Sequence, residues 1–152
     1  MHALAIALAL GIGFVAGLRS FTAPAAISWG AYLGKLNLHN SLASGPIVGL
    51  LSILAFSEYI ADLLPKTPNR TATVPLITRI ITGGFSGAFL CGSANQPWII
   101  GAVLGGIGGV IGAFAGYHAR KWLVQSLHAK DAVIAIPEDL TAIALACLIV
   151  FS

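Results

Sequence analysis

The sequence predicts an all-helical integral membrane protein with about five transmembrane helices, the first of them broken. Of its 152 residues, 57% are hydrophobic and only 9% are charged, and the mean hydropathy is +0.91. Soluble domains carry about 25% charged residues, and a soluble domain of this size leaves roughly a third of its unfolded surface wet. The composition therefore excludes a soluble enzyme, a nucleic-acid-binding protein and a disordered chain. It makes the lipid bilayer the expected partner.

The first apolar stretch, residues 3–34, does not fit one straight crossing. As a single helix it would measure about 48 Å, well beyond the roughly 30 Å hydrocarbon core of a bilayer. Its middle is interrupted by polar and helix-breaking residues, namely Arg19, Ser20, Thr22 and Pro24. Pro24 lacks a backbone donor and disfavours helical backbone at Ala23. We predict a spanning helix broken there, with a second part that is tilted or re-entrant; whether the stretch crosses once or twice stays open.

Four further spans of suitable length are predicted, at about residues 45–64, 74–92, 98–122 and 132–151. Trp98 and Trp122 mark the two ends of one span, as expected for aromatic rings at the membrane interfaces. The polar segments between the spans are short. We therefore expect residues 1–152 to form a single integral membrane domain.

Basic residues predict the orientation. The loops expected on one side carry five of them, Lys66, Arg70, Arg120, Lys121 and Lys130, whereas the opposite loops carry only Lys35. The positive-inside rule places the basic side in the cytoplasm, and the expected location is a bacterial inner (cytoplasmic) membrane. Five crossings put the N-terminus in the cytoplasm and the C-terminus outside. If the first stretch crosses twice, the N-terminus lies outside.

Glycines at helical spacing predict close helix packing. They are Gly13 and Gly17 in the first span, and Gly101, Gly105, Gly108, Gly112 and Gly116 in the span at 98–122. Glycines four residues apart share a helix face and let a second helix approach at backbone distance. We expect the two glycine faces to pack on each other, either within the chain or across a homodimer.

The two glycine-rich segments also resemble each other in sequence. Residues 11–17 (GIGFVAG) match residues 106–112 (GIGGVIG) at five of seven positions. With five crossings these helices run in opposite directions, which predicts an inverted repeat of the kind that many transporters contain. A chance match between two glycine-rich apolar helices is the alternative.

Charged residues inside the predicted spans form the candidate ion or solute site, which comprises Arg19, Glu58, Asp62, Arg79, Glu138 and Asp139. Glu58, Arg79 and the Glu138–Asp139 pair lie about 7–10 Å from the basic ends of their spans, so independent helices place them at one depth. A charge at the centre of a membrane helix costs about 2.5–3.5 kcal/mol, so such residues pair. Arg19 lies about 24 Å along the first span and joins them only if the break or a tilt brings it near.

Three interpretations of these charges stay open: an ion-pair network that locks the helices, a cation or proton site, and an anion site built on Arg19 and Arg79. Arg120 could add positive charge from the end of its span. Glu58, one turn deeper than Asp62, is the best candidate for a proton-coupled or cation-binding position.

We expect a transporter or channel for a cation or other small solute; the alternative is a structural or accessory membrane protein without transport. An enzyme is not expected, because no nucleophile–base pair is present. The histidines have no ligand partner at helical spacing, so no metal site and no cofactor are expected.

Two segments carry a resemblance to a known family. Residues 10–21 (LGIGFVAGLRSF) and residues 58–65 (EYIADLLP) resemble the bacterial membrane family catalogued as domain of unknown function 4126. Pro75 with Arg79 and Gly83, and the late Glu138–Asp139 pair before an apolar tail, fit the layout of that family. The resemblance covers nearly the whole chain. It implies a compact polytopic protein whose arginines and acids are family features, and it implies no activity.

Overall fold

The structure, a computed structural model, describes residues 2–38, 41–64, 71–128 and 130–151. These residues form six α-helices and one short 3₁₀ helix: α1 (His2–Leu18), α2 (Thr22–Tyr32), η1 (Ser41–Ala43), α3 (Gly45–Asp62), α4 (Thr73–Ser93), α5 (Trp98–Leu127) and α6 (Asp131–Phe151). Four of them, α3 to α6, are long and apolar enough to cross a membrane, and α1 is a shorter apolar helix. The predicted all-helical membrane fold is confirmed.

The helix α5 is longer than the span that the tryptophans marked. It has 30 residues and continues past Trp122 to Leu127, a length of about 45 Å against a bilayer core of roughly 30 Å. The segment after Trp122 contains no glycine or proline that would stop a helix. The helix ends where His128 adopts the left-handed conformation, with φ 49°, which is a common helix C-cap geometry.

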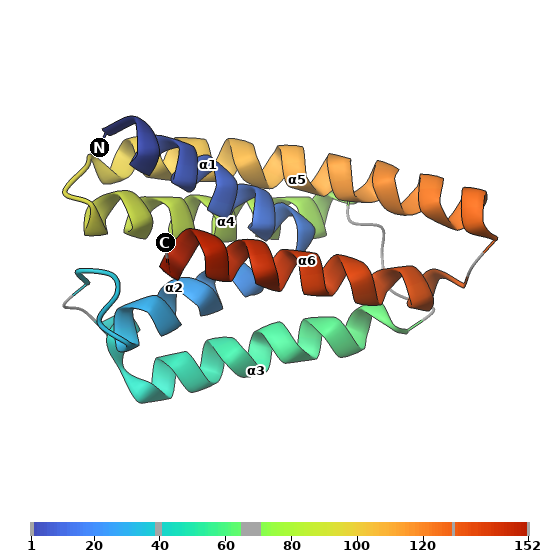
Figure 1. The fold of residues 1–152 in the computed structure, drawn as a ribbon, viewed down its shortest axis with the longest axis horizontal. Coiled ribbons are helices and arrows are strands. Elements are labelled where there is room, and N and C mark those ends of the chain that lie inside the picture. Colours follow the sequence, from blue (N-terminus) through green and yellow to red (C-terminus); the bar gives the residue numbers. More distant parts are fainter. Residues whose placement is uncertain (1, 39–40, 65–70, 129, 152) are drawn as a thin grey trace.

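The first apolar stretch forms a helical hairpin. The helix α2 lies antiparallel to α3, because Thr22 bonds to Tyr59 while Trp29, further along α2, bonds to Ser52. The chain enters the bundle along α1 and returns to the same end along α2 (Figure 1). With 11 residues, α2 measures about 16 Å and cannot cross a bilayer core. The second part of the stretch is therefore re-entrant.

The break in this stretch lies at residues 19–21, within the predicted segment from Arg19 to Pro24, but Pro24 itself does not interrupt a helix. Pro24 is the third residue of α2. In the first turn of a helix a missing N–H leaves no intrahelical hydrogen bond unmade, so proline is tolerated there.

The predicted inverted repeat is wrong. Gly13 of α1 packs against Gly105 of α5, and Gly17 packs further along α5 against Gly109 and Ala113, so the two helices run in the same direction. If the chain crossed the membrane fully five times, α1 and α5 would run in opposite directions. The hairpin contributes two partial passages in place of one full crossing, and this reverses the direction of α1 relative to α5.

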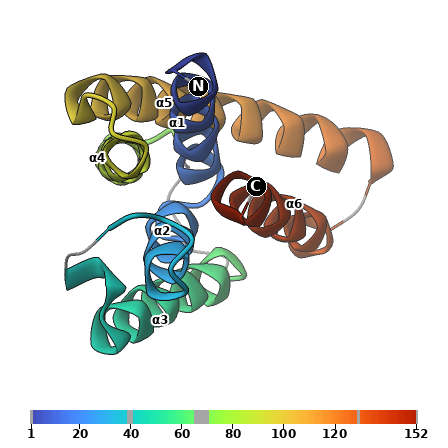
Figure 2. The same cartoon turned by 60° about the vertical axis from the view of Figure 1, so that its left-hand side comes forward.

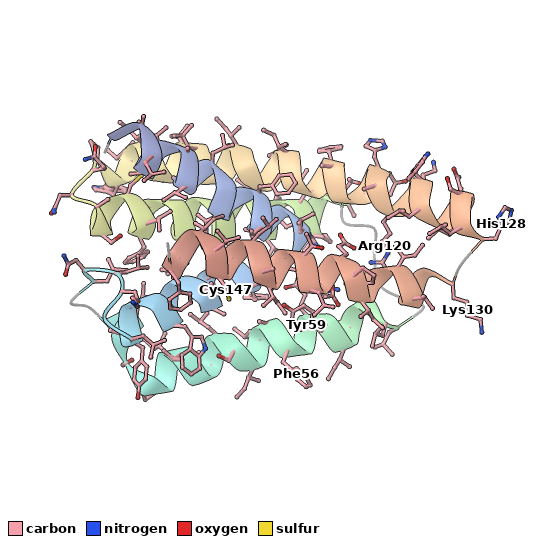
Figure 3. All side chains as sticks on the ribbon, viewed as in Figure 1. Phe56, Tyr59, Arg120, His128, Lys130 and Cys147 are labelled. Atoms are coloured by element: carbon pink, nitrogen blue, oxygen red, sulfur yellow. The ribbon has the colours of Figure 1, made fainter. Side chains whose placement is uncertain are left out.

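The start of α1 and the end of α6 lie in the same half of the bundle (Figure 1). Cys91, near the end of α4, lies 3.9 Å from the carbonyl oxygen of Ala5, and Ile149 of α6 packs on Gly11. Arg120 and Lys130 lie toward the other end (Figure 3). Five crossings would place the start of the chain at the same end as the basic loops, whereas α1 begins at the end of the bundle opposite to Arg120 and Lys130. Lys66 and Arg70 lie outside the described residues.

The helices α1 and α4 pack on α5 backbone to backbone. A Cβ atom added to Gly17 would lie 2.6 Å from the backbone nitrogen of Ala113, and one added to Gly109 would lie 2.6 Å from the carbonyl oxygen of Arg79. The same closeness to a neighbouring backbone holds for Gly13, Gly101, Gly105, Gly108 and Gly112, and Gly116 is buried. The glycine faces are therefore covered within the chain, and a homodimer would have to use another surface.

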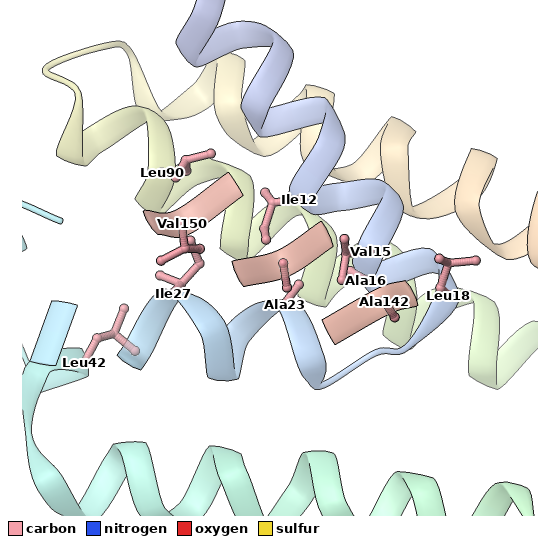
Figure 4. Packing of buried hydrophobic residues seen from close by; sticks show 11 residues of the cluster. Ile12, Val15, Ala16, Leu18, Ala23, Ile27, Leu42, Leu90, Ala142 and Val150 are labelled. Carbon is pink, nitrogen blue, oxygen red and sulfur yellow. The ribbon is translucent and has the colours of Figure 1, made fainter. Parts of the chain in front are cut away.

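A small apolar core joins the hairpin to the other helices. Ile12 and Val15 of α1, Ile27 of α2, Leu90 of α4 and Val150 of α6 are buried together (Figure 4). Viewed from the side, the hairpin lies between the α4–α5 pair and α3, with α6 beside it (Figure 2). This packing holds the tip of the hairpin inside the bundle.

Candidate functional site

The tip of the hairpin is surrounded by charged side chains from every long helix. The structure brings all six charged residues of the candidate site together, and Arg120 joins them through Asp62 and Glu138. We call these seven residues the ion-pair network. Its members on α3 to α6 lie about 6–12 Å inside the basic ends of these helices, counted from the helix termini, except Asp62, which is the last residue of α3. The predicted common depth of the acids and Arg79 is thus reproduced by the fold.

Arg79 of α4 binds the end of α1. Its side chain is only 4% exposed, and its Nη1 donates hydrogen bonds to the carbonyl oxygens of Gly17 and Leu18, the latter at 2.9 Å. Carbonyls in the last turn of a helix have no intrahelical donor, and the C-terminus of a helix carries partial negative charge. The guanidinium therefore satisfies both the hydrogen-bonding and the electrostatic requirement of this helix end.

Glu58 of α3 binds the backbone amides that precede α2, as Arg79 binds the carbonyls that end α1. Its Oε1 accepts a hydrogen bond from the backbone N–H of Ser20 at 2.8 Å, and its Oε2 accepts one from Phe21 at 3.0 Å. The N-cap residue of α2 supplies no side-chain hydrogen bond of its own. Glu58 Oε1 also lies 3.9 Å from Arg79 Nη2. One acid and one arginine thus hold the two sides of the break, and Glu58 has a structural role that the sequence did not suggest.

Arg19 is the centre of the network and is fully buried. Its Nε donates to Asp139 Oδ1 at 2.7 Å, and its Nη1 lies 2.8 Å from Asp62 Oδ2. The guanidinium carbon lies 4.8 Å from the centre of the Tyr59 ring, a cation–π geometry.

The depth of Arg19 could not be decided from the sequence, because the first span was expected to start at the basic end of the bundle, which would place Arg19 far from the acids. In the fold, α1 starts at the opposite end, so the same 24 Å or so brings Arg19 to the acids.

Arg120 of α5 connects α3 to α6. Its Nη1 lies 3.6 Å from Asp62 Oδ2 and 3.7 Å from Glu138 Oε2. Among the described residues, the network therefore contains three guanidiniums and four carboxylates. Arg120 and Tyr59 were not among the predicted site residues. The excess of acids over arginines in the predicted site indicated that a further basic residue such as Arg120 takes part. Tyr59 could have been found from its position between Glu58 and Asp62 on the same helix.

Two grooves adjoin the network. The first groove, of about 510 Å³, lies between α1, α5 and α6, and its lining is apolar except for Arg120, Glu138 and Thr141. The second groove, of about 400 Å³, lies between α2, α3 and α6, and is lined by four aromatic side chains together with Thr22, Ser52 and Cys147. Trp29, Phe56, Tyr59 and Phe151 are the aromatic residues. Volumes of about 300–1,000 Å³ are typical of ligand pockets.

The grooves occupy different halves of the bundle. On α6, the first groove uses residues 133–145 and the second uses residues 143–151. Figure 3 shows Arg120, which lines the first groove, displaced along the bundle from Cys147, which lines the second. Tyr59 lines the second groove and stacks on Arg19, so the network adjoins the first groove through Arg120 and Glu138 and the second groove through Tyr59. Over the described part of the chain, no group of three His, Cys, Asp or Glu residues is placed to hold a metal ion.

These features define a class of protein: an all-helical membrane protein built around a re-entrant hairpin whose tip is held by buried charges. The chain belongs to the family described as a domain of unknown function, DUF4126, which matches residues 6–152. No curated protein and no solved structure matches the chain. The family resemblance seen in the sequence is thus confirmed.

The contacts of Arg79 predict a large loss of stability on its removal. Arg79→Ala leaves two carbonyls of α1 without their donor and Glu58 without this cation, and it should cost about 3–5 kcal/mol of unfolding free energy. Arg79→Lys keeps the charge but not the forked donor group, so its loss should be intermediate. Thermal unfolding of the purified protein in detergent measures both.

Lys121→Ala is the matched control, because Lys121 is an exposed basic residue on α5 and its loss should change stability by less than about 0.5 kcal/mol. Equal melting temperatures for Arg79→Ala and Lys121→Ala would contradict the capping role.

Proposed function

We propose that this protein is a small transporter or channel for a cation or other small solute, and that the ion-pair network is its gate. The observation that carries the proposal is that the network adjoins two grooves, the first through Arg120 and Glu138 and the second through Tyr59, which stacks on Arg19. In the proposed function, a solute passes from one groove to the other at the network. A purely structural charge cluster needs no cavity on either side of it.

The form of the hairpin supports the same function. Many membrane transporters bind their substrates at helices that are interrupted within the bilayer, because the exposed helix ends carry partial charges. Here the two helix ends at the break are occupied by Arg79 and Glu58. In the proposed function this arrangement is the closed state, in which the charges of the protein satisfy each other.

The helix α6 is the element that separates the two grooves. It contains Pro137 near the first groove. Proline removes one backbone hydrogen bond from a helix interior and favours a kink there. A change in the kink at this position would move the following part of α6, which carries Glu138 and Asp139, relative to α1 and α5. We therefore assign the opening movement to α6.

A structural or accessory protein without transport is the second candidate. The observation that favours it is that each carboxylate of the network lies within 4 Å of an arginine nitrogen. A network with these contacts is sufficient to lock the hairpin into the bundle in a protein that transports nothing. Flux measurements separate the two candidates directly.

We further propose that the basic end of the bundle faces the cytoplasm of a bacterial inner membrane, following the positive-inside rule. Both termini then face outward. In a variant lacking the native cysteines, Ala94→Cys in the α4–α5 turn should react with an impermeant maleimide from outside intact cells. Lys130→Cys should react only after permeabilisation, and the reverse pattern would contradict this orientation.

The transport proposal predicts a cation or proton flux that depends on Asp62. Asp62 joins Arg19 to Arg120, whereas Glu58 accepts hydrogen bonds from the amides at the break, so Asp62→Asn is more informative about transport than a change at Glu58. We expect proteoliposomes to show flux of protons, Na⁺ or K⁺ above empty vesicles. Asp62→Asn should lower that flux roughly tenfold or more, a barrier change of about 1.4 kcal/mol.

Asp131→Asn provides the control, since it removes the same charge at the first residue of α6, about two turns before Glu138. It should leave the flux unchanged. Flux no higher than that of empty vesicles for all three ions, with Asp62→Asn altering only thermal stability, would establish the structural alternative instead.

A further inference from the structure

We propose that Tyr59 is a lid that closes the ion-pair network toward the second groove, and that Thr22 holds this lid shut. The inference rests on the proposed function and names the residue that controls access to the gate from one side. Three observations carry it: the burial of Arg19, the position of the Tyr59 ring against it, and the hydrogen bond that fixes the ring.

The second groove meets the network at Tyr59. Among the described residues that line this groove, none carries a charge. Tyr59 lines the groove, and its ring contacts the network, because the guanidinium carbon of Arg19 lies 4.8 Å from the ring centre. Arg19 itself is fully buried and does not line the groove. The ring therefore covers the guanidinium on the side of the groove.

The other contacts of Arg19 are harder to break than the contact with the ring. Its Nε donates to Asp139 at 2.7 Å, and its Nη1 lies 2.8 Å from Asp62 and donates to the backbone carbonyl oxygen of Glu58 at 3.3 Å. Breaking the ion pairs would separate buried charges, which is strongly destabilising. Moving an aromatic ring away from the cation separates no pair of charges and gives up only the weaker cation–π attraction. Movement of Tyr59 thus requires less free energy than movement of Arg19.

Thr22 of α2 fixes the ring of Tyr59. The hydroxyl oxygens of the two residues lie 2.9 Å apart and share a hydrogen bond. Thr22 is buried and begins α2, so the helix sets its position. Tyr59 is only half-buried, and the groove beside it has a volume of about 400 Å³. When the hydrogen bond breaks, the ring has space into which it can turn, as side chains do between staggered rotamers.

In the proposed function, this turn of the ring joins the second groove to the buried guanidinium. The barrier on this side of the network is then one aromatic ring held by one neutral hydrogen bond. With the ring in place, solutes in the groove are kept from the ion pairs, which are strengthened by the low local dielectric.

Chemical modification of arginine tests the lid without any measurement of flux. Phenylglyoxal, a small reagent that attacks accessible guanidinium groups, is added to the purified protein in detergent, and modified residues are identified by peptide mass spectrometry. Arg19 should react slowly in the native protein. In Tyr59→Ala it should react roughly tenfold faster or more, because protection depends on the free energy of local opening. Phe56→Ala, which removes an exposed ring from the same groove and helix, should leave the native rate unchanged.

Arg79 monitors the fold in the same experiment. Its side chain is 4% exposed and binds the end of α1, so it should react only when the whole bundle loosens. Faster modification of Arg19 with Arg79 still protected would support the lid. An unchanged rate at Arg19 in Tyr59→Ala, or an equal increase in Phe56→Ala, would overturn it.

Two milder variants test the hydrogen bond and decide the matter alone if Tyr59→Ala also exposes Arg79. Tyr59→Phe and Thr22→Val each remove the bond between the hydroxyls with little change in shape. Each should raise the rate of Arg19 modification roughly three- to tenfold, the usual effect of one neutral hydrogen bond. The double variant should be no faster than either single variant, because both changes remove the same interaction. No increase in either variant, or increases that multiply in the double variant, would overturn the proposal.

The modification result is separate from the flux result. Faster modification of Arg19 in Tyr59→Phe and Thr22→Val, in a protein that moves no ion across vesicles, would support the lid and overturn transport. Ion flux in a protein whose Arg19 reacts equally slowly in all these variants would overturn the lid and leave the proposed transport function standing.

Discussion

A chain that turns back inside a membrane must satisfy the backbone groups at its turn, and the rest of this structure depends on how that is done. Hydrocarbon offers no hydrogen bonds, so irregular backbone at membrane depth is tolerated only where protein covers it. Here Arg79 binds the last carbonyls of α1, and Glu58 binds the first amides before α2. The signs of these charges match those of the helix ends. The backbone groups at the break are thus satisfied by side chains from α3 and α4.

The ion pairs of Arg19 and the close packing of α1, α4 and α5 both place charged side chains at the tip of the hairpin. A buried arginine or carboxylate needs a partner, and Arg19 at the turn is paired with Asp62 and Asp139 from two further helices. The glycines of α1, α4 and α5 let these helices approach at backbone distance, and this close packing carries Arg79 to the end of α1. The network that holds the hairpin also contributes Arg120 and Glu138 to the wall of the first groove.

Much of this arrangement could be predicted from the sequence. The part that could not depends on one question, namely whether the first apolar stretch crosses the membrane once or turns back within it. Hydropathy located the four long helices, and depth counting grouped Glu58, Arg79 and Glu138. The same counting left the depth of Arg19 undecided, because the sequence does not tell whether a stretch of 32 residues crosses the membrane once or returns. That choice fixed the direction of α1, the side of the N-terminus and the false inverted repeat. Local pattern could not decide it, because the groups that stabilise the return are far away in the sequence.

The central claim is that Glu58 holds the amides of Ser20 and Phe21 inside the bundle, and amide hydrogen exchange followed by NMR tests it most directly. In the native protein both amides should exchange slowly. In Glu58→Ala they should exchange roughly 10- to 100-fold faster, the effect of losing a charged acceptor. Ser57→Ala, at a neighbouring residue whose hydroxyl bonds within its own helix, should leave them protected. Rapid exchange at both amides in the native protein, or protection that survives Glu58→Ala, would contradict the account.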